Sequence, residues 1–368
     1  MCRSPTVRHN DEKHEVRRGN LVTFSAFIDA LIANPILGVI VAIAIGATIV
    51  NGATDAPNAI ATVVGTRALD PDRAILMAAA CNLIGLFLIS FVTTAVAHTI
   101  LNMVDFGGDN HMALIAVCAG SVSIIVWGII SWYFGLPTSN SHALCAGITG
   151  AGVAITGFAG ISGHEWMLIL VGLVGSVVCG FGLGWLFARL TNVLFSSTNR
   201  TKVRDGFRIA QIATGAGVAL LHGAQDGQKF LSIALMGIII ATGGDLNEMG
   251  GMPLWLILVI ALSMGLGTAL GGKRIIKTVG MNLAKLEMHQ GCVASLAAAA
   301  CIAIATFTGM PVSTTHTSTA AIMGVGAERN IKHVNWSTTK TMVLAWIITF
   351  PACGIIGYAL TKVFLLFM

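Results

Sequence analysis

An apolar stretch between Pro35 and Arg67 is interrupted by polar residues, and this interruption constrains the fold more than any other feature of the chain. Asp55, Pro57 and Asn58 lie inside it. Proline disfavours a regular helix, and a charged side chain at bilayer depth costs about 2.5–3.5 kcal/mol unless it faces a cavity, a partner or an ion. An interrupted helix with a carboxylate is typical of solute and ion sites in transporters. The alternative is a kinked helix whose Asp55 only bonds a neighbouring helix.

The composition favours an integral membrane protein. Of the 368 residues, 55% are hydrophobic and 10% are charged, whereas globular chains carry about 25% charged residues. The net charge of +5 is spread over loops, which indicates membrane topology, and no nucleic-acid partner is expected. The eight cysteines lie mostly in apolar runs without the spacing of a metal site. We therefore expect an all-α polytopic protein in a lipid bilayer, with about ten membrane elements.

The expected membrane elements follow one another along the chain at about 20 residues each. After the first, they lie near 74–98, 111–133, 139–158, 166–190, 209–242, 254–270, 291–308, 312–326 and 342–367, with an amphipathic surface helix at 273–286. The predicted organisation is a polar tail with a candidate interfacial helix at 1–34, a first repeat at 35–160, a connecting helix and basic linker at 161–208, a second repeat at 209–327, and a C-terminal transmembrane helix at 328–368.

Two motifs each occur twice, at nearly one spacing. Gly-Ala-x-Asp ends at Asp55 and again at Asp226, 171 residues later. Gly-x-Pro-x-Ser-x-x-His ends at His142 and again at His316, 174 residues later. Two different motifs with almost the same offset indicate a duplication. By analogy with the first copy, a second polar break is expected at 224–230.

The charges of the loops reverse between the two copies. Arg67 and Arg73 follow the first interrupted element, whereas the equivalent loop in the second copy holds Asp245 and Glu248. Positive charge accumulates on the cytoplasmic side of membrane proteins, so the two copies are predicted to be inverted-topology repeats with broken helices. The basic residues of the N-terminal tail leave the side of the N-terminus open.

Each Gly-x-Pro-x-Ser-x-x-His motif opens an apolar segment. Proline suits the first turn of a helix and serine suits its cap, and the free amides of a helix start form an anion site. One such motif would be ordinary capping, but two of them beside two aspartates favour a shared oxyanion pocket. The candidate substrate contacts are Ser139, Asn140, Ser141, Ser313, Thr314 and Thr315.

These doubled motifs resemble the inorganic phosphate transporter (Pit) family, and residues 271–280 and 324–327 resemble its bacterial low-affinity permeases. The resemblance extends from about residue 35 to the C-terminus. It implies import of inorganic phosphate by cation symport through alternating access, a homodimer, and a multi-pass location in the inner cell membrane. No enzymatic activity and no cofactor other than the coupling cation, H⁺ or Na⁺, are expected.

The resemblance also assigns roles to single residues. Asp55 and Asp226 are expected to bind the coupling ion, together with Thr54 and Gln225, which stand where the family often has Asn. Asn58 is expected to contact substrate or ion. The resemblance also implies a candidate sodium site at Asp55, Asn58 and Asp226.

Lys229 stands in the second copy where the first copy has Asn58. Its ammonium can act as a counter-charge to Asp226 or to phosphate in place of a bound Na⁺, which favours proton coupling with Asp55 or Asp226 as the carrier. The alternative is a structural ion pair between residues three apart on one helix, and the two interpretations are compatible. His142 and His316 are expected to bond backbone carbonyls rather than relay protons.

Several alternatives stay open at this point. A sodium-coupled permease for phosphate or sulfate would use the same helix starts, and an anion channel would lack accumulation against a gradient. An intramembrane enzyme would use Ser139 with His142, or Ser313 with His316, as nucleophile and base, but their spacing fits capping better. ATP-driven transport is not supported, because the chain contains no phosphate-binding Gly-x-x-x-x-Gly-Lys-Ser/Thr sequence.

Overall fold

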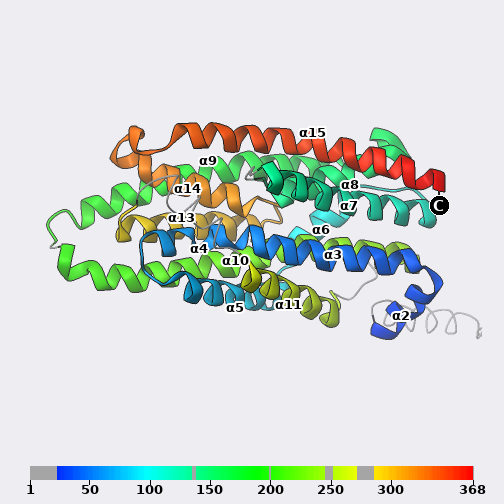
Figure 1. The fold of residues 1–368 in the computed structure, drawn as a ribbon, viewed down its shortest axis with the longest axis horizontal. Coiled ribbons are helices and arrows are strands. Elements are labelled where there is room, and N and C mark those ends of the chain that lie inside the picture. The colour runs from blue at the N-terminus through cyan, green and yellow to red at the C-terminus, as the bar shows by residue number, and fades with distance from the viewer. Residues whose placement is uncertain (1–22, 135–137, 199, 245–251, 272–285, 368) are drawn as a thin grey trace, which may run out of the picture.

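The structure, a computed structural model, describes residues 23–134, 138–198, 200–244, 252–271 and 286–367. Over these residues the protein is a helical bundle, with most helices close to the long axis (Figure 1). The helices are α2 (Phe24–Ala33), α3 (Pro35–Thr54), α4 (Ala56–Gly65), α5 (Pro71–Ser90), α6 (Ala95–Asn102), α7 (Asn110–Phe134), α8 (Asn140–Thr156), η1 (Gly157–Gly160), α9 (Gly163–Leu194), α10 (Arg200–Thr242), α11 (Leu254–Leu270), α13 (Met288–Phe307), α14 (Thr314–Arg329), η3 (Ile331–His333) and α15 (Trp336–Phe367).

The described helices confirm a multi-pass membrane protein. Seven stretches are long and apolar enough to cross a bilayer, with α3 and α4 counted together: Pro35–Gly65, Pro71–Ser90, Asn110–Ile130, Asn140–Gly160, Gly163–Leu194, Met288–Phe307 and Trp336–Phe367. Large apolar side chains such as Val178 on α9 and Ile347 on α15 are exposed. Outward apolar side chains are expected where a helix meets lipid rather than water.

The first polar interruption breaks the helix as predicted. α3 ends at Thr54, Asp55 stands between the two helices, and α4 restarts with Pro57 in its first turn. The predicted break at 224–230 is wrong, because α10 continues without interruption from Arg200 to Thr242. The second polar motif, at 223–230, contains no proline, so its backbone keeps every intrahelical donor. Only the side chains are polar at that point, and those of Gln225, Gln228 and Lys229 donate to groups of neighbouring segments.

Two other boundaries differ from those expected. The span predicted at 74–98 is divided, since α5 ends at Ser90 and α6 begins at Ala95. The basic linker up to residue 208 is instead the first part of α10. The acidic residues 245 and 248 lie outside the described residues, as does the predicted surface helix at 273–286 except for its last residue.

Glycines allow two pairs of helices to cross at contact distance. On α8, Gly150 leaves no room for a Cβ because the backbone of Gly354 on α15 lies against it. On α9, Gly184 lies in the same way against the backbone of Ala321 on α14. Small residues let membrane helices approach closely and pack by van der Waals contact. The two crossings bring α8 onto α15 and α14 onto α9.

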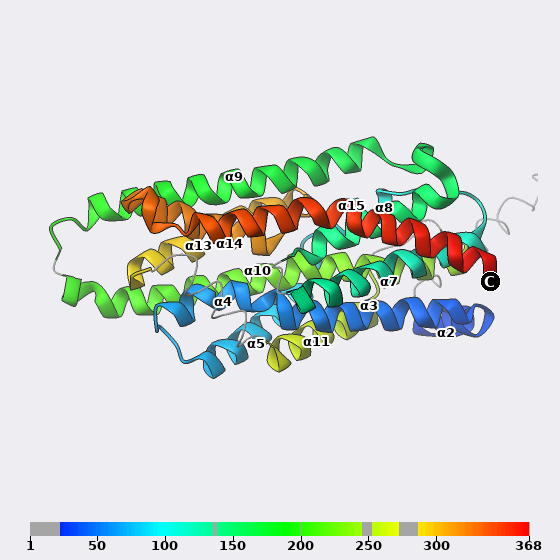
Figure 2. The ribbon, with the colours of Figure 1, turned by 45° about the horizontal axis from the view of Figure 1, so that its top comes forward.

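The remaining helices surround α10. This helix packs on α5 and α13, while α11 packs on α3 and α5. In both views α5 and α11 lie on the side of the bundle opposite α9 and α15 (Figures 1 and 2). The shorter helices α8 and α14 lie in opposite halves of the bundle along its long axis (Figure 1). The side chains of the predicted site converge between these two helices, the α3–α4 break and α10.

Candidate functional site

The two aspartates of the repeated motif lie together, and one amide joins them. Asn51 Nδ2 donates to Asp55 Oδ2 over 3.1 Å and to Asp226 Oδ2 over 3.3 Å. Asp55 is 6% exposed and Asp226 is 1% exposed. The α3–α4 break thus places the carboxylate of the first copy against the uninterrupted helix that carries the second. We call Asp55, Asp226, Lys229, Ser141 and Thr315 the central polar site.

Asp226 has two nitrogen partners from its own helix. Lys229 Nζ lies 2.7 Å from Asp226 Oδ1, and His222 Nε2 lies 3.3 Å from Asp226 Oδ2. The lysine follows Asp226 by three residues and the histidine precedes it by four, so both fall on its face of α10. The predicted ion pair between Lys229 and Asp226 is confirmed. The charge of Asp226 is therefore balanced within the protein.

Asp55 lacks a comparable partner. In the described ranges, the ion pairs at this site go to Asp226 and none goes to Asp55. Its donors are the neutral amides of Asn51 and Asn140. Two buried acceptor atoms, Asn51 Oδ1 and Asn58 Oδ1, have no hydrogen-bond partner among the residues described. The first copy therefore presents a carboxylate and unused oxygen atoms where the second copy presents a completed ion pair.

Both predicted helix starts are present. Ser139 caps α8 by accepting from the backbone N–H of His142, and Ser313 caps α14 by accepting from the backbone N–H of His316. Ordinary capping is thus a correct interpretation for these two serines. The hydroxyls that follow each cap, including Ser141, Thr314 and Thr315, are buried at the first turns.

Each copy of the aspartate motif contacts the helix start of the other copy. Lys229 Nζ donates to Ser141 Oγ of α8 over 2.7 Å, and Asn58 Nδ2 donates to Thr315 Oγ1 of α14 over 2.8 Å. Thr314 Oγ1 also donates to Asp226 Oδ2 over 3.4 Å. The structure therefore brings three predicted substrate contacts, Ser141, Thr314 and Thr315, into one buried cluster with the two aspartates.

The residues preceding the two aspartates are placed differently. Thr54 accepts from the amide of Asn140 at 3.2 Å, which joins the α3–α4 break to the start of α8. Gln225 is instead engaged away from the carboxylates. Its Nε2 donates to the carbonyl of Met310 over 2.8 Å, and its Oε1 accepts from Thr306 over 2.9 Å. Both polar atoms of Gln225 thus already have protein partners.

The irregular segment before α14 is held by side chains. The carbonyl of Gly309 accepts from Thr99, that of Met310 accepts from Gln225, and that of Val312 accepts from Lys229. Backbone outside a helix is tolerated at membrane depth only when its polar groups are satisfied by protein or water. These side chains therefore fix the position from which α14 begins.

Sequence reasoning missed two contributors to the site, Asn51 and Asn82. Asn51 precedes Asp55 by four residues, and helical spacing alone would place both on one face. His222 Nδ1 lies 2.9 Å from Asn82 Oδ1 of α5, whose amide in turn donates to Thr268 of α11 over 2.9 Å. No local pattern marks Asn82, because its role depends on the packing of α5 against α10.

The expectation that His142 and His316 bond backbone carbonyls is wrong. All four ring nitrogens are without a hydrogen-bond partner in the described part of the chain. The two rings instead meet edge to face, with centroids 4.5 Å apart. His142 stacks on Phe350 and His316 stacks on Trp346, both from α15. The pair joins the first turns of α8 and α14 on the side covered by α15.

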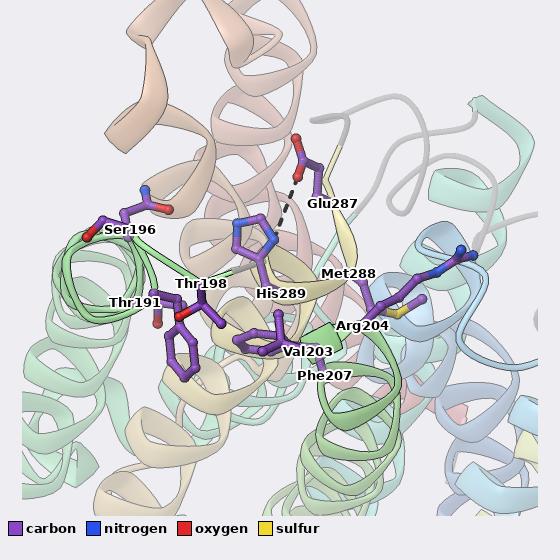
Figure 3. A pocket seen from close by; sticks show the side chains of 11 residues that line it. Thr191, Ser196, Thr198, Val203, Arg204, Phe207, Glu287, Met288 and His289 are labelled. Atoms are coloured by element: carbon purple, nitrogen blue, oxygen red, sulfur yellow. Dashed lines mark ion pairs between the residues drawn. The ribbon is translucent and has the colours of Figure 1, made fainter. Parts of the chain in front are cut away.

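A surface pocket of about 300 Å³ lies apart from the central polar site. It is formed where α9, α10 and the start of α13 meet, and Figure 3 shows Arg204, Phe207, Glu287 and His289 around it. None of its lining residues belongs to the predicted site. The described residues also contain no group of three or more His, Cys, Asp or Glu side chains that could hold a metal ion.

A bundle of membrane-spanning helices with buried carboxylates, an ammonium and two helix starts at its centre defines an integral membrane transporter for a polar solute. The chain belongs to the phosphate transporter family, whose model matches residues 51–357. The family consists of transporters, so the chain is a transporter and not an enzyme.

Similar proteins agree with this assignment. A probable low-affinity inorganic phosphate transporter of Bacillus subtilis (strain 168) is 38% identical over 330 residues, which cover 90% of this chain and 97% of that protein. A protein of the same description from Rhizobium meliloti (strain 1021) is 36% identical, again over 90% of this chain and 97% of the relative. Among solved structures, a sodium-dependent phosphate transporter shares the fold, with a TM-score of 0.83, 21% identity, and coverage of 91% of this chain and 100% of that one.

Proposed function

We propose that this protein imports inorganic phosphate by cation symport through alternating access, and that the coupling cation is a proton. The observation that carries the proposal is the junction of both helix starts with both carboxylates in one buried cluster. Phosphate would bind between the first turns of α8 and α14. There the hydroxyls of Ser141, Thr314 and Thr315 and free helix amides would donate to its oxygens.

Charge explains why phosphate would need a co-transported cation. Asp226 is balanced by Lys229, but Asp55 has no ion-pair partner in the described residues. Two unit charges 4 Å apart repel by about 4 kcal/mol at an effective dielectric constant of 20. A cation at Asp55 removes that repulsion, so phosphate and cation would bind more tightly together than either alone. We therefore assign the coupling ion to Asp55 rather than to Asp226.

A proton would fit the surroundings of Asp55. Once protonated, the carboxyl group becomes a donor, and the unpartnered Asn51 Oδ1 and Asn58 Oδ1 are acceptors. The same two oxygens favour a second candidate, a sodium-coupled phosphate transporter, because hard cations take carboxylate and amide oxygens as ligands. The two candidates differ only in the ion bound at Asp55.

Alternating access is supported by reciprocal contacts. The Lys229–Ser141 and Asn58–Thr315 hydrogen bonds join equivalent positions of the two motif copies. The α8–α15 and α9–α14 crossings are equivalent in the same way. We propose that the copies are inverted repeats that rock about this cluster. A location in the inner cell membrane and a homodimer are also proposed from the family resemblance, and the mass of the purified protein in detergent tests the dimer.

Uptake of labelled phosphate by proteoliposomes tests the function. An inward proton gradient, imposed without a sodium gradient, is expected to drive accumulation above the external concentration. Asp55→Asn is expected to abolish accumulation, whereas Asp205→Asn, the same change at an exposed residue of α10, is expected to preserve it. Accumulation driven by sodium alone would establish the second candidate. Equilibration without accumulation would indicate a channel, and stronger competition by sulfate than by arsenate would indicate a sulfate permease.

A further inference from the structure

The ammonium of Lys229 is held by three oxygen atoms from three parts of the chain. Asp226 Oδ1 lies 2.7 Å from Nζ, Ser141 Oγ lies 2.7 Å away, and the carbonyl of Val312 also accepts from it. Lys229 is 1% exposed. A carboxylate, a hydroxyl and a backbone carbonyl are the oxygen ligands that hard cations take in proteins, at about 2.3–2.6 Å for Ca²⁺.

The three oxygen atoms match the three N–H donors of the buried ammonium. An ion pair between residues three apart on α10 would supply only one of them, the carboxylate of Asp226. Here α8 supplies a hydroxyl, and the segment before α14 supplies a carbonyl. If the ammonium were absent, these oxygens would face one another in a buried space with no positive charge between them. The shell around Nζ is therefore organised as a cation-binding shell.

The equivalent position in the first copy has no ammonium. Asn58 occupies the place of Lys229, and Thr315 occupies the place of Ser141. The carboxylate is retained as Asp55, and the Oδ1 atom of Asn58 has no partner in the described ranges. The two copies thus share a carboxylate and a hydroxyl, but only the second contains its own cation.

We propose that Lys229 permanently fills an alkali-cation site at Asp226, leaving one exchangeable cation site, at Asp55. Replacing Lys229 with the residue of the first copy, asparagine, would then open the second site to Na⁺. The proposed Na⁺ binding in Lys229→Asn depends only on the oxygen atoms that surround Lys229 Nζ. The statement that the exchangeable cation site is at Asp55 rests on the proposed function.

Binding of labelled Na⁺ to the purified full-length protein in detergent tests the site without transport. Lys229→Asn is expected to bind one more Na⁺ per chain than the unchanged protein. The double variant Lys229→Asn/Asp226→Asn is expected to lose that ion, and Lys340→Asn, an exposed lysine of α15, is expected to gain none. A folded Lys229→Asn protein that binds no additional Na⁺ would overturn the proposal.

Thermal melting provides a second measurement of Na⁺ binding and also shows whether each variant folds. A ligand that binds only the folded state raises the melting temperature with its concentration. The difference in melting temperature between NaCl and choline chloride is therefore expected to be larger for Lys229→Asn than for the unchanged protein. Lys229→Ser offers a smaller oxygen-bearing side chain for the same comparison. If neither variant folds even in high Na⁺, the proposal is contradicted, because Na⁺ must be able to replace the ammonium.

Transport separates this proposal from the proposed function. Phosphate uptake by Lys229→Asn is expected to fall about tenfold or more in choline, since an unpaired buried carboxylate is costly, and to recover in Na⁺. If the unchanged protein does not accumulate phosphate on a proton gradient, the proposed function fails, yet the gain in Na⁺ binding would still establish the site. If the unchanged protein accumulates phosphate but Lys229→Asn gains no Na⁺, only the cation-site proposal fails.

Discussion

Asn58 donates a 2.8 Å hydrogen bond to the hydroxyl of Thr315, although 257 residues separate them in the chain. The equivalent pair in the other direction, Lys229 and Ser141, is joined over 2.7 Å. Each aspartate-bearing segment is thus tied to the helix start of the other motif copy. Any movement of one copy relative to the other must therefore change the surroundings of both carboxylates.

Loss of the helix-start hydroxyls is expected to weaken phosphate binding. Ser141→Ala and Thr315→Val each remove a hydroxyl from the proposed pocket, and a hydrogen bond to a charged group contributes about 1.5–3 kcal/mol, so the KM for phosphate should rise about tenfold or more. Uptake kinetics in proteoliposomes measure this. Ser121→Ala is the matched control, because Ser121 is buried on α7 and bonds only Val117 of its own helix among the described contacts. An unchanged KM in both pocket variants would place the phosphate elsewhere.

The two carboxylates are expected to differ in their contribution to stability. Asp226→Asn leaves the buried ammonium of Lys229 without its carboxylate, and breaking a buried ion pair on one side costs about 3–5 kcal/mol. Asp55→Asn removes an unbalanced charge and should cost much less. Thermal unfolding of both variants in detergent compares them. A larger loss for Asp55→Asn would contradict the ion pairing described above, and Asp226→Asn/Lys229→Met should recover part of the stability.

Lys229→Arg is expected to impair transport despite keeping the charge. The ammonium is a compact donor to three oxygens from α8, α10 and the segment before α14, whereas a guanidinium is planar and larger. The Vmax of phosphate uptake should therefore fall strongly. Lys340→Arg, at an exposed position of α15, makes the same change outside the site and should leave uptake unaltered. Full activity of Lys229→Arg would show that charge alone suffices there.

The α9–α14 crossing provides a test of packing within one helix. A side chain on Gly184 would meet the backbone of Ala321, whereas a side chain on Gly182 would meet nothing within 4 Å. Overpacking costs about 1–3 kcal/mol, so Gly184→Leu should lower the melting temperature clearly and Gly182→Leu should not. Equal melting temperatures for the two variants would show that α9 and α14 do not cross at Gly184.

The sequence predicted features that depend on local backbone chemistry. Pro57 removes a donor, and the helix is broken beside it. The serine caps of α8 and α14 followed from the residue type and its place before an apolar run. The ion pair of Lys229 with Asp226 followed from helical spacing. In each case the interacting groups are within a few residues of one another.

Features that depend on packing between helices could not be predicted in this way. Polar residues at 224–230 were expected to break a helix, but α10 continues because neighbouring helices satisfy its side chains. His142 and His316 stack on α15 instead of bonding carbonyls, and only the fold places Phe350 and Trp346 against them. The roles of Thr54 and Gln225 in ion coupling stay predictions. For Gln225 the contacts with Met310 and Thr306 favour a positioning role.

The location of bound phosphate tests the central claim most directly. An experimental structure of the protein in lipid nanodiscs, determined with phosphate and without it, would locate the anion. We expect density for phosphate between the first turns of α8 and α14, within hydrogen-bond distance of Ser141 and Thr315 and beside Asp55. Phosphate bound elsewhere, with the cluster of Asp55, Asp226 and Lys229 unchanged by its presence, would contradict the claim.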